Sequence, residues 1–227
     1  MKFFVVAFLV ATLTAASPII PPESEMIEIQ ARQFGSSKTE LESGSSSACP
    51  KAILIFARGS TETGNLGMLG VPLSNALERR YGAANIWIQG VGGPYGAHIA
   101  DNSLPRGSSA PAIREGVRLL NLANTKCPSS VVVTGGYSQG AALLAAALTD
   151  VTAAVRNKVV GTVLFGYTQN LQNHGGIPSY PSDRLKVFCA VGDLVCDGTL
   201  TITAAHLSYG DEAADEAPKF LISKIGA

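Results

Sequence analysis

Apolar residues follow two alternating patterns along this chain from residue 49 onward. Short runs rich in Val and Ile are typical of strands buried on both faces, whereas longer stretches with apolar residues every three or four positions are typical of amphipathic helices. Their alternation indicates a parallel sheet with helices on both faces. The expected strands span 52–57, 85–89, 131–134, 162–165 and 185–191, and the expected helices span 66–81, 110–122, 139–148 and 213–225.

This pattern predicts the α/β class, as a three-layer α/β/α sandwich around a mostly parallel, five-stranded sheet. In such folds the loops that follow the strands meet at the carboxyl edge of the sheet and carry the functional groups. The functional groups of this chain are therefore expected directly after the predicted strands.

The first 48 residues differ in composition from the rest. Lys2 precedes an apolar run that is too short to span a bilayer, and small residues follow it, which favours a signal peptide over residues 1–16 rather than a buried helix. Residues 17–48 are rich in Pro, Ser and Glu, as in a pro-segment or flexible leader. Residues 49–227 would then form one domain, secreted to the extracellular medium and without an integral membrane segment.

The charge balance limits the classes of binding partner that we expect. Seventeen Lys and Arg residues match seventeen Asp and Glu residues, so no net field attracts nucleic acid or an anionic membrane. A neutral, apolar substrate fits this balance better than a phosphorylated one, and we expect no nucleic-acid partner.

Four cysteines fit an oxidising compartment and allow three pairings. Cys189 and Cys196 bracket a short turn. Cys49 and Cys127 each lie three residues before a predicted strand, so they meet if those strands are neighbours in the sheet. The alternative is a zinc site, but neither spacing is the short paired kind that zinc sites use. We expect two disulfides, Cys49–Cys127 and Cys189–Cys196.

The run G-Y-S-Q-G at 136–140 has the form G-x-S-x-G and lies between an apolar strand and an alanine-rich helix. In that context the turn exposes a strained nucleophilic serine, here Ser138. Gly136 and Gly140 would be required because the strand and the helix pack closely. The alternative is a structural glycine turn that happens to contain a serine.

A serine hydroxyl needs a base and an acid, which follow it in the order acid then histidine in hydrolases of this type. His98 precedes Ser138, and His174 precedes the best acid, so His206 is the expected base. Asp193 directly follows the last predicted strand, in a loop that the Cys189–Cys196 bridge would hold. Its competitors are Asp197, just beyond the bridge, and Asp183, before the strand.

The oxyanion of the tetrahedral intermediate requires two backbone N–H donors. One would be that of Gln139, the residue after the nucleophile. The second must come from a loop after a neighbouring strand, and the loop 56–64 is a candidate. An ordinary Gly/Ser/Thr loop explains the same residues, and spacing alone does not decide between the two.

Together these residues resemble the fungal cutinase family from Cys49 to the C-terminus. The segments that carry the resemblance are F-A-R-G-S-T-E-T-G-N-L-G (56–67), D-N-S-L-P-R-G (101–107), N-T-K-C-P (124–128), G-G-Y-S-Q-G-A-A-L (135–143), G-T-V-L-F-G-Y-T (161–168), G-D-L-V-C (192–196) and A-H-L-S-Y-G (205–210).

The resemblance implies a small lidless α/β-hydrolase with Ser138, Asp193 and His206 as its triad. It also implies that the amides of Ser60 and Gln139 form the oxyanion hole, with the Ser60 hydroxyl as a further donor and the Asn102 side chain holding Ser60. Both expected disulfides match the family. No metal or other cofactor is implied.

The substrates implied are insoluble cutin, a polyester of hydroxylated fatty acids, and short-chain fatty-acid esters, and we expect a monomer. Asp197 and His174 add titratable groups that could alter the pH dependence.

The alternatives are a related carbohydrate deacetylase such as an acetylxylan esterase, and a secreted elicitor without catalytic activity. Six apolar residues are candidates for the substrate lining, although ordinary core packing explains many such residues: Ile99, Leu194, Val195, Leu200, Ile202 and Leu207.

Overall fold

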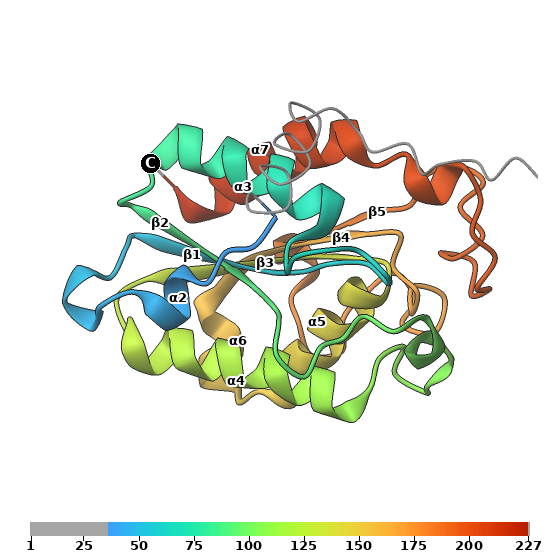
Figure 1. The fold of residues 1–227 in the computed structure, drawn as a ribbon, viewed down its shortest axis with the longest axis horizontal. Coiled ribbons are helices and arrows are strands. Elements are labelled where there is room, and N and C mark those ends of the chain that lie inside the picture. Colours follow the sequence, from blue (N-terminus) through green and yellow to red (C-terminus); the bar gives the residue numbers. More distant parts are fainter. Residues whose placement is uncertain (1–35, 227) are drawn as a thin grey trace, which may run out of the picture.

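Five parallel strands form the centre of the computed structural model, which describes residues 36–226 (Figure 1). Their order across the sheet is β2-β1-β3-β4-β5, and every neighbouring pair is parallel. The predicted fold class is therefore confirmed. The strands are β1 (Ala52–Ala57), β2 (Ile86–Gly90), β3 (Val131–Tyr137), β4 (Val159–Phe165) and β5 (Leu185–Phe188).

Helices cover both faces of the sheet (Figure 1). Successive side chains of a strand point to opposite faces, and β1 shows the result. Its Ile53 and Ile55 pack in one apolar cluster, with α4 and α5, whereas Leu54 and Phe56 pack in a second cluster, with α3 and α7. The longer helices are α3 (Gly67–Tyr81) and α7 (Ala217–Ile225) on one face, and α4 (Ala110–Lys126), α5 (Gln139–Asp150) and α6 (Ala153–Lys158) on the other.

Several element boundaries differ from the sequence-based expectation, among them the end of β5 at Phe188 rather than residue 191, and two of the differences have clear reasons. β3 continues through Gly135 and Gly136 to Tyr137, because the ring of Phe56 packs over Gly135, where a Cβ would lie 2.8 Å from it. The C-terminal helix expected over 213–225 is interrupted. A short π-helix, η5 (Glu212–Glu216), precedes α7, whose second residue Pro218 has no N–H for a regular helical bond.

The part of the expected flexible leader that the structure describes, residues 36–48, is packed against the sheet. It contains α2 (Glu40–Ser43), whose Leu41 is fully buried. β2 is an edge strand with unpaired polar groups. A Glu40 carboxylate oxygen accepts the Ile88 N–H at 2.7 Å, and Thr39 bridges to Gln89. This segment is thus an integral cover for the sheet edge, while the predicted signal peptide lies outside the described residues.

Two disulfides join the cysteines as expected. Cys49–Cys127 links the segment before β1 to the end of α4, since β1 and β3 are neighbours with Ala52 opposite Val131. Cys189–Cys196 closes the loop after β5. Among residues 36–226, no helix is both long and apolar enough to cross a membrane.

Candidate active site

Ser138 lies in the turn between β3 and α5, at the carboxyl edge of the sheet. Its backbone has φ +53° and ψ −117°, a conformation that is strained for a residue with a side chain. The turn is tight because α5 starts against β1: a Cβ on Gly140 would lie 2.1 Å from the Ala57 carbonyl oxygen. The Ser138 N–H donates to the Phe165 carbonyl at 2.9 Å, which fixes the turn to β4.

His206 is the base-type side chain that reaches this serine. It lies in the short helix η4 (Ala205–Leu207), and its Nε2 is 3.0 Å from Ser138 Oγ. The imidazole is 2% exposed and stacks on the Tyr137 ring at 5.2 Å. Gly166 permits this approach, because a Cβ there would lie 2.6 Å from the imidazole Cε1. His206 is the histidine that chain order selects as the expected base.

Asp193 completes a linear chain of hydrogen bonds. His206 Nδ1 lies 2.9 Å from Asp193 Oδ2 and 3.0 Å from Oδ1, and the carboxylate is buried. The Val195 N–H donates to Oδ1 at 3.0 Å within the bridged loop. The two competing aspartates are both exposed: Asp197 lies beyond the bridge, and Asp183 lies in η3 (Ser182–Arg184) at the amino end of β5.

The opposite side of Ser138 carries hydrogen-bond donors. Ser60 follows β1, and its Oγ accepts from Asn102 Nδ2 at 2.8 Å and from Gln139 Nε2 at 3.2 Å. Two accepted bonds leave the hydroxyl proton of Ser60 free to donate elsewhere. Gln139 is the first residue of α5, so its N–H has no partner inside the helix, and the positive end of the helix dipole lies there. This arrangement can stabilise a negative charge that develops near Ser138.

Comparison with known proteins places the chain in one family. A family model described as Cutinase matches residues 48–225. The chain belongs to the cutinase family. It is 54% identical to "Cutinase 2" of Fusarium vanettenii, over 100% of this chain and 98% of that protein. Membership in the cutinase family makes the chain a carboxylic ester hydrolase.

Two solved structures give the same fold. A Trichoderma reesei cutinase in complex with a phosphonate inhibitor aligns with a TM-score of 0.70 and 27% identity, covering 90% of this chain and 87% of that one. The catalytic core domain of acetyl xylan esterase from Trichoderma reesei aligns with a TM-score of 0.61 and 21% identity, covering 78% and 99% respectively. The second likeness concerns the fold alone.

A hollow of about 210 Å³ lies beside Ser138 in this cutinase-family chain. Ser138, His206, Ser60 and Asn102 line it together. Of the six apolar residues predicted for the substrate lining, five line the hollow; Leu194 is 38% exposed and does not. The five are Ile99, Val195, Leu200, Ile202 and Leu207, and the lining also includes Thr61, Tyr137 and Thr168, which the sequence pattern does not indicate.

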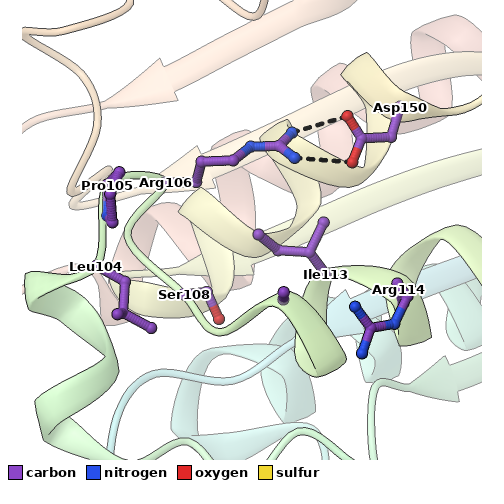
Figure 2. A pocket seen from close by; sticks show the side chains of 8 residues that line it. Leu104, Pro105, Arg106, Ser108, Ile113, Arg114 and Asp150 are labelled. Atoms are coloured by element: carbon purple, nitrogen blue, oxygen red, sulfur yellow. Dashed lines mark hydrogen bonds and ion pairs between the residues drawn. The ribbon is translucent and has the colours of Figure 1, made fainter.

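A second, larger hollow of about 430 Å³ lies at the start of α4 (Figure 2). Its walls include an ion pair in which Arg106 binds both carboxylate oxygens of Asp150, at 2.8 and 2.9 Å. Ser108 also lines it, but the hydroxyl has no hydrogen-bond partner, and no lining residue is a histidine. This hollow therefore lacks a serine–histidine contact of the kind that Ser138 and His206 make in the smaller one.

Glu62 is a structural member of the site that the sequence pattern does not single out. Its carboxylate accepts the Gly59 N–H at 2.6 Å and the Met68 N–H at 2.9 Å. The backbone carbonyl of Glu62 accepts from Arg58 Nε at 2.8 Å. Burial raises the pKa of this carboxyl above its ordinary value. These bonds fix the loop that carries Ser60.

The remaining histidines stay apart from the serine. His98 precedes η2 (Ile99–Ser103), and its carbonyl accepts from Gln139 Nε2 at 2.7 Å, so its backbone supports the donor side of the site. His174 lies in a turn with φ +52°. Within residues 36–226, no group of three or more His, Cys, Asp or Glu side chains is placed to hold a metal ion.

Proposed function

We propose that this chain is a secreted esterase that hydrolyses cutin and short-chain fatty-acid esters through an acyl-enzyme on Ser138. The observation that carries the proposal is the unbroken Asp193–His206–Ser138 hydrogen-bond chain beside a hollow with a mainly apolar lining. The relatives named cutinases support the polyester as substrate. An open hollow with exposed Ile99 and Leu207 at its rim suits an insoluble substrate.

In the acylation step, His206 Nε2 takes the Ser138 proton while Oγ attacks the ester carbonyl carbon. The charge that develops on the carbonyl oxygen is stabilised by the N–H groups of Ser60 and Gln139 and by the Ser60 hydroxyl. Asp193 stabilises the imidazolium and fixes the tautomer in which Nδ1 carries hydrogen. The imidazolium then protonates the alcohol, which leaves, and the acyl group remains on Ser138.

In the deacylation step, a water molecule takes the place of the alcohol. His206 Nε2 removes a proton from the water, and the resulting hydroxyl attacks the acyl carbon through a second oxyanion. Ser138 leaves with the proton returned by the imidazolium, and the carboxylic acid is released. Both steps require neutral imidazole, so activity should be lost at acid pH and persist at alkaline pH.

The test combines labelling with substitution. A fluorescent alkyl phosphonate should label Ser138, and Ser138→Ala should abolish labelling and lower kcat for p-nitrophenyl butyrate by about 10⁴-fold or more. Ser108→Ala, in the larger hollow, is the matched control and should leave both unchanged. Full activity of Ser138→Ala, or a label on another residue, would contradict the proposal. Inertness of the native chain towards the ester would favour the non-catalytic elicitor.

Product identification separates the two candidate esterases. Incubated with cutin and with acetylated xylan, the chain should release hydroxy fatty acids from the first and little acetate from the second. Leu200, Ile202 and Leu207 favour this outcome, because an acetyl group would cover little of the apolar surface that they offer. Acetate as the main product would instead indicate the carbohydrate deacetylase.

A further inference from the structure

Tyr209 lies three residues after His206 and is almost completely buried, with 1% of its surface exposed. Its phenol oxygen accepts the Ala190 N–H at 3.0 Å. The same oxygen makes a short hydrogen bond to Asp193 Oδ2. Because an ionised carboxylate can only accept, the phenol proton must be directed at Asp193.

The Asp193 carboxylate has three kinds of donor. The Val195 N–H bonds to Oδ1, Tyr209 bonds to Oδ2, and His206 Nδ1 lies within 3.0 Å of both oxygens. Val195 and Tyr209 hold one oxygen each, so the carboxylate cannot rotate without breaking a bond. Tyr209 therefore donates to Oδ2, the carboxylate oxygen that lies nearer to His206 Nδ1.

The Tyr209 ring is itself immobilised by aromatic neighbours. It contacts Phe165 at 6.1 Å, Tyr137 at 6.3 Å and the His206 ring edge-on at 6.4 Å, between ring centroids. Tyr137 in turn donates to the His206 carbonyl at 2.8 Å. A phenol on a fixed ring is a donor in a fixed position, as positioning an acid requires.

We propose that Tyr209 is a positioning residue of the triad: it orients the Asp193 carboxylate towards His206 and moderates the negative charge that the imidazole experiences. The inference rests on the proposed function and extends it by one residue. Its consequence is that Tyr209 affects both the rate of proton transfer and the pH at which His206 loses its proton.

The sign of the pH effect follows from the groups around Asp193. Besides Asp193 itself, these are His206, Tyr209 and Tyr137, with Glu62 beyond Tyr137. Burial raises the pKa of both phenols, so they remain protonated donors at neutral pH. Without the Tyr209 hydroxyl, the carboxylate holds an imidazolium more strongly and takes up a proton more readily. Both changes move the acid limb of the pH–rate profile to higher pH.

The experiment compares Tyr209→Phe with Tyr180→Phe. Tyr180 is the matched control because it is also buried, and its hydroxyl donates to the Val159 carbonyl at 3.0 Å, at the amino end of β4, away from the site. For p-nitrophenyl butyrate, Tyr209→Phe should lower kcat per phosphonate-titrated serine about tenfold, with KM within about twofold. Its acid limb should rise by about 0.5–1 pH unit, whereas Tyr180→Phe should change none of these.

A second variant keeps the hydroxyl and reverses the pH effect. 3-Fluorotyrosine at position 209 has a more acidic phenol, which donates more strongly, so the acid limb should move to lower pH. The downfield proton signal of His206 Nδ1–H should shift in both Tyr209 variants and stay in place in Tyr180→Phe.

Each contrary outcome has a defined meaning. A loss of kcat in Tyr209→Phe with an unmoved acid limb and an unmoved Nδ1–H signal would reduce Tyr209 to a packing role and overturn the inference. Unchanged kinetics, with Ser138→Ala inactive, would overturn it too and leave the proposed function intact. An active Ser138→Ala would instead refute the proposed function itself.

Discussion

The two sides of Ser138 are built in different ways. On the acid–histidine side, Asp193, His206 and Tyr209 are each no more than 2% exposed, and every hydrogen-bonding atom discussed there has a partner. On the donor side, Ser60 and Asn102 are only partly buried. Here the Ser60 hydroxyl proton stays free, because Ser60 Oγ acts as the acceptor in its hydrogen bonds with Asn102 and Gln139.

The difference reflects the task that each side performs. A buried carboxylate must have its donors in place before the reaction, because an unpaired charge in the interior is costly. In the proposed mechanism, the donor side must keep hydrogens free for an oxygen that arrives with the substrate. The acid–histidine side is therefore complete in itself, whereas the donor side is completed by the substrate.

The loops are also fixed by different means. The Cys189–Cys196 bridge closes the loop that carries Asp193. The loop that carries Ser60 depends on the Glu62 carboxylate, which accepts two backbone N–H groups. A covalent bridge is insensitive to moderate changes of pH, but a buried carboxylate is not.

The largest effect is expected on the acid–histidine side. Asp193→Asn should lower kcat by about 10⁴-fold with little change in KM, because an amide favours the wrong imidazole tautomer. Steady-state kinetics with p-nitrophenyl butyrate measures both constants. The exposed Asp197→Asn is the control and should stay within about twofold of the native rate. A mild effect of Asp193→Asn would show that this side is less complete than the geometry indicates.

A smaller effect is expected on the donor side. Ser60→Ala keeps the backbone N–H and removes only the hydroxyl, so kcat should fall by about 10²-fold. Asn102→Ala should cost less, because Gln139 Nε2 still contacts Ser60 Oγ. Inhibition by a phosphonate, whose oxygen occupies the oxyanion position, should weaken in the same order. If Asn102→Ala were the more damaging change, the orientation of Ser60 would matter more than its hydroxyl.

The smallest effect concerns the pH dependence of stability. Burial raises the pKa of Glu62 above its ordinary value, so the folded state favours the protonated carboxyl. The associated stability is present below the ordinary pKa and is lost as pH rises through the raised value. Thermal unfolding from pH 4 to 7 should therefore show the native chain losing stability relative to Glu62→Gln. A difference in Tm that is constant with pH would mean that Glu62 acts through its hydrogen bonds alone.

Several features follow from the sequence because they depend on local patterns. The apolar runs identify the strands within a few residues, since a strand buried on both faces needs a continuous apolar segment. The G-x-S-x-G pattern selects Ser138 from the sequence alone. The glycine of the pattern at position 140 is required because α5 meets β1 there and leaves no room for a Cβ. Chain order selects His206, and the place of Asp193 after the last predicted strand selects that aspartate, for the contacts that the structure shows.

Other features depend on residues that only folding brings together. The roles of Glu62 and Tyr209 depend on hydrogen bonds to partners that folding brings close. The position of a Glu or a Tyr in the sequence does not indicate which group that partner is. The packing of residues 36–48 depends on the open edge of β2, and a polar composition does not reveal that edge. The sequence by itself determined the fold class and the reactive triad candidates, because these follow from periodicity and chain order. The tertiary structure decided which polar side chains hold them, because burial and hydrogen-bond geometry exist only once the layers have packed.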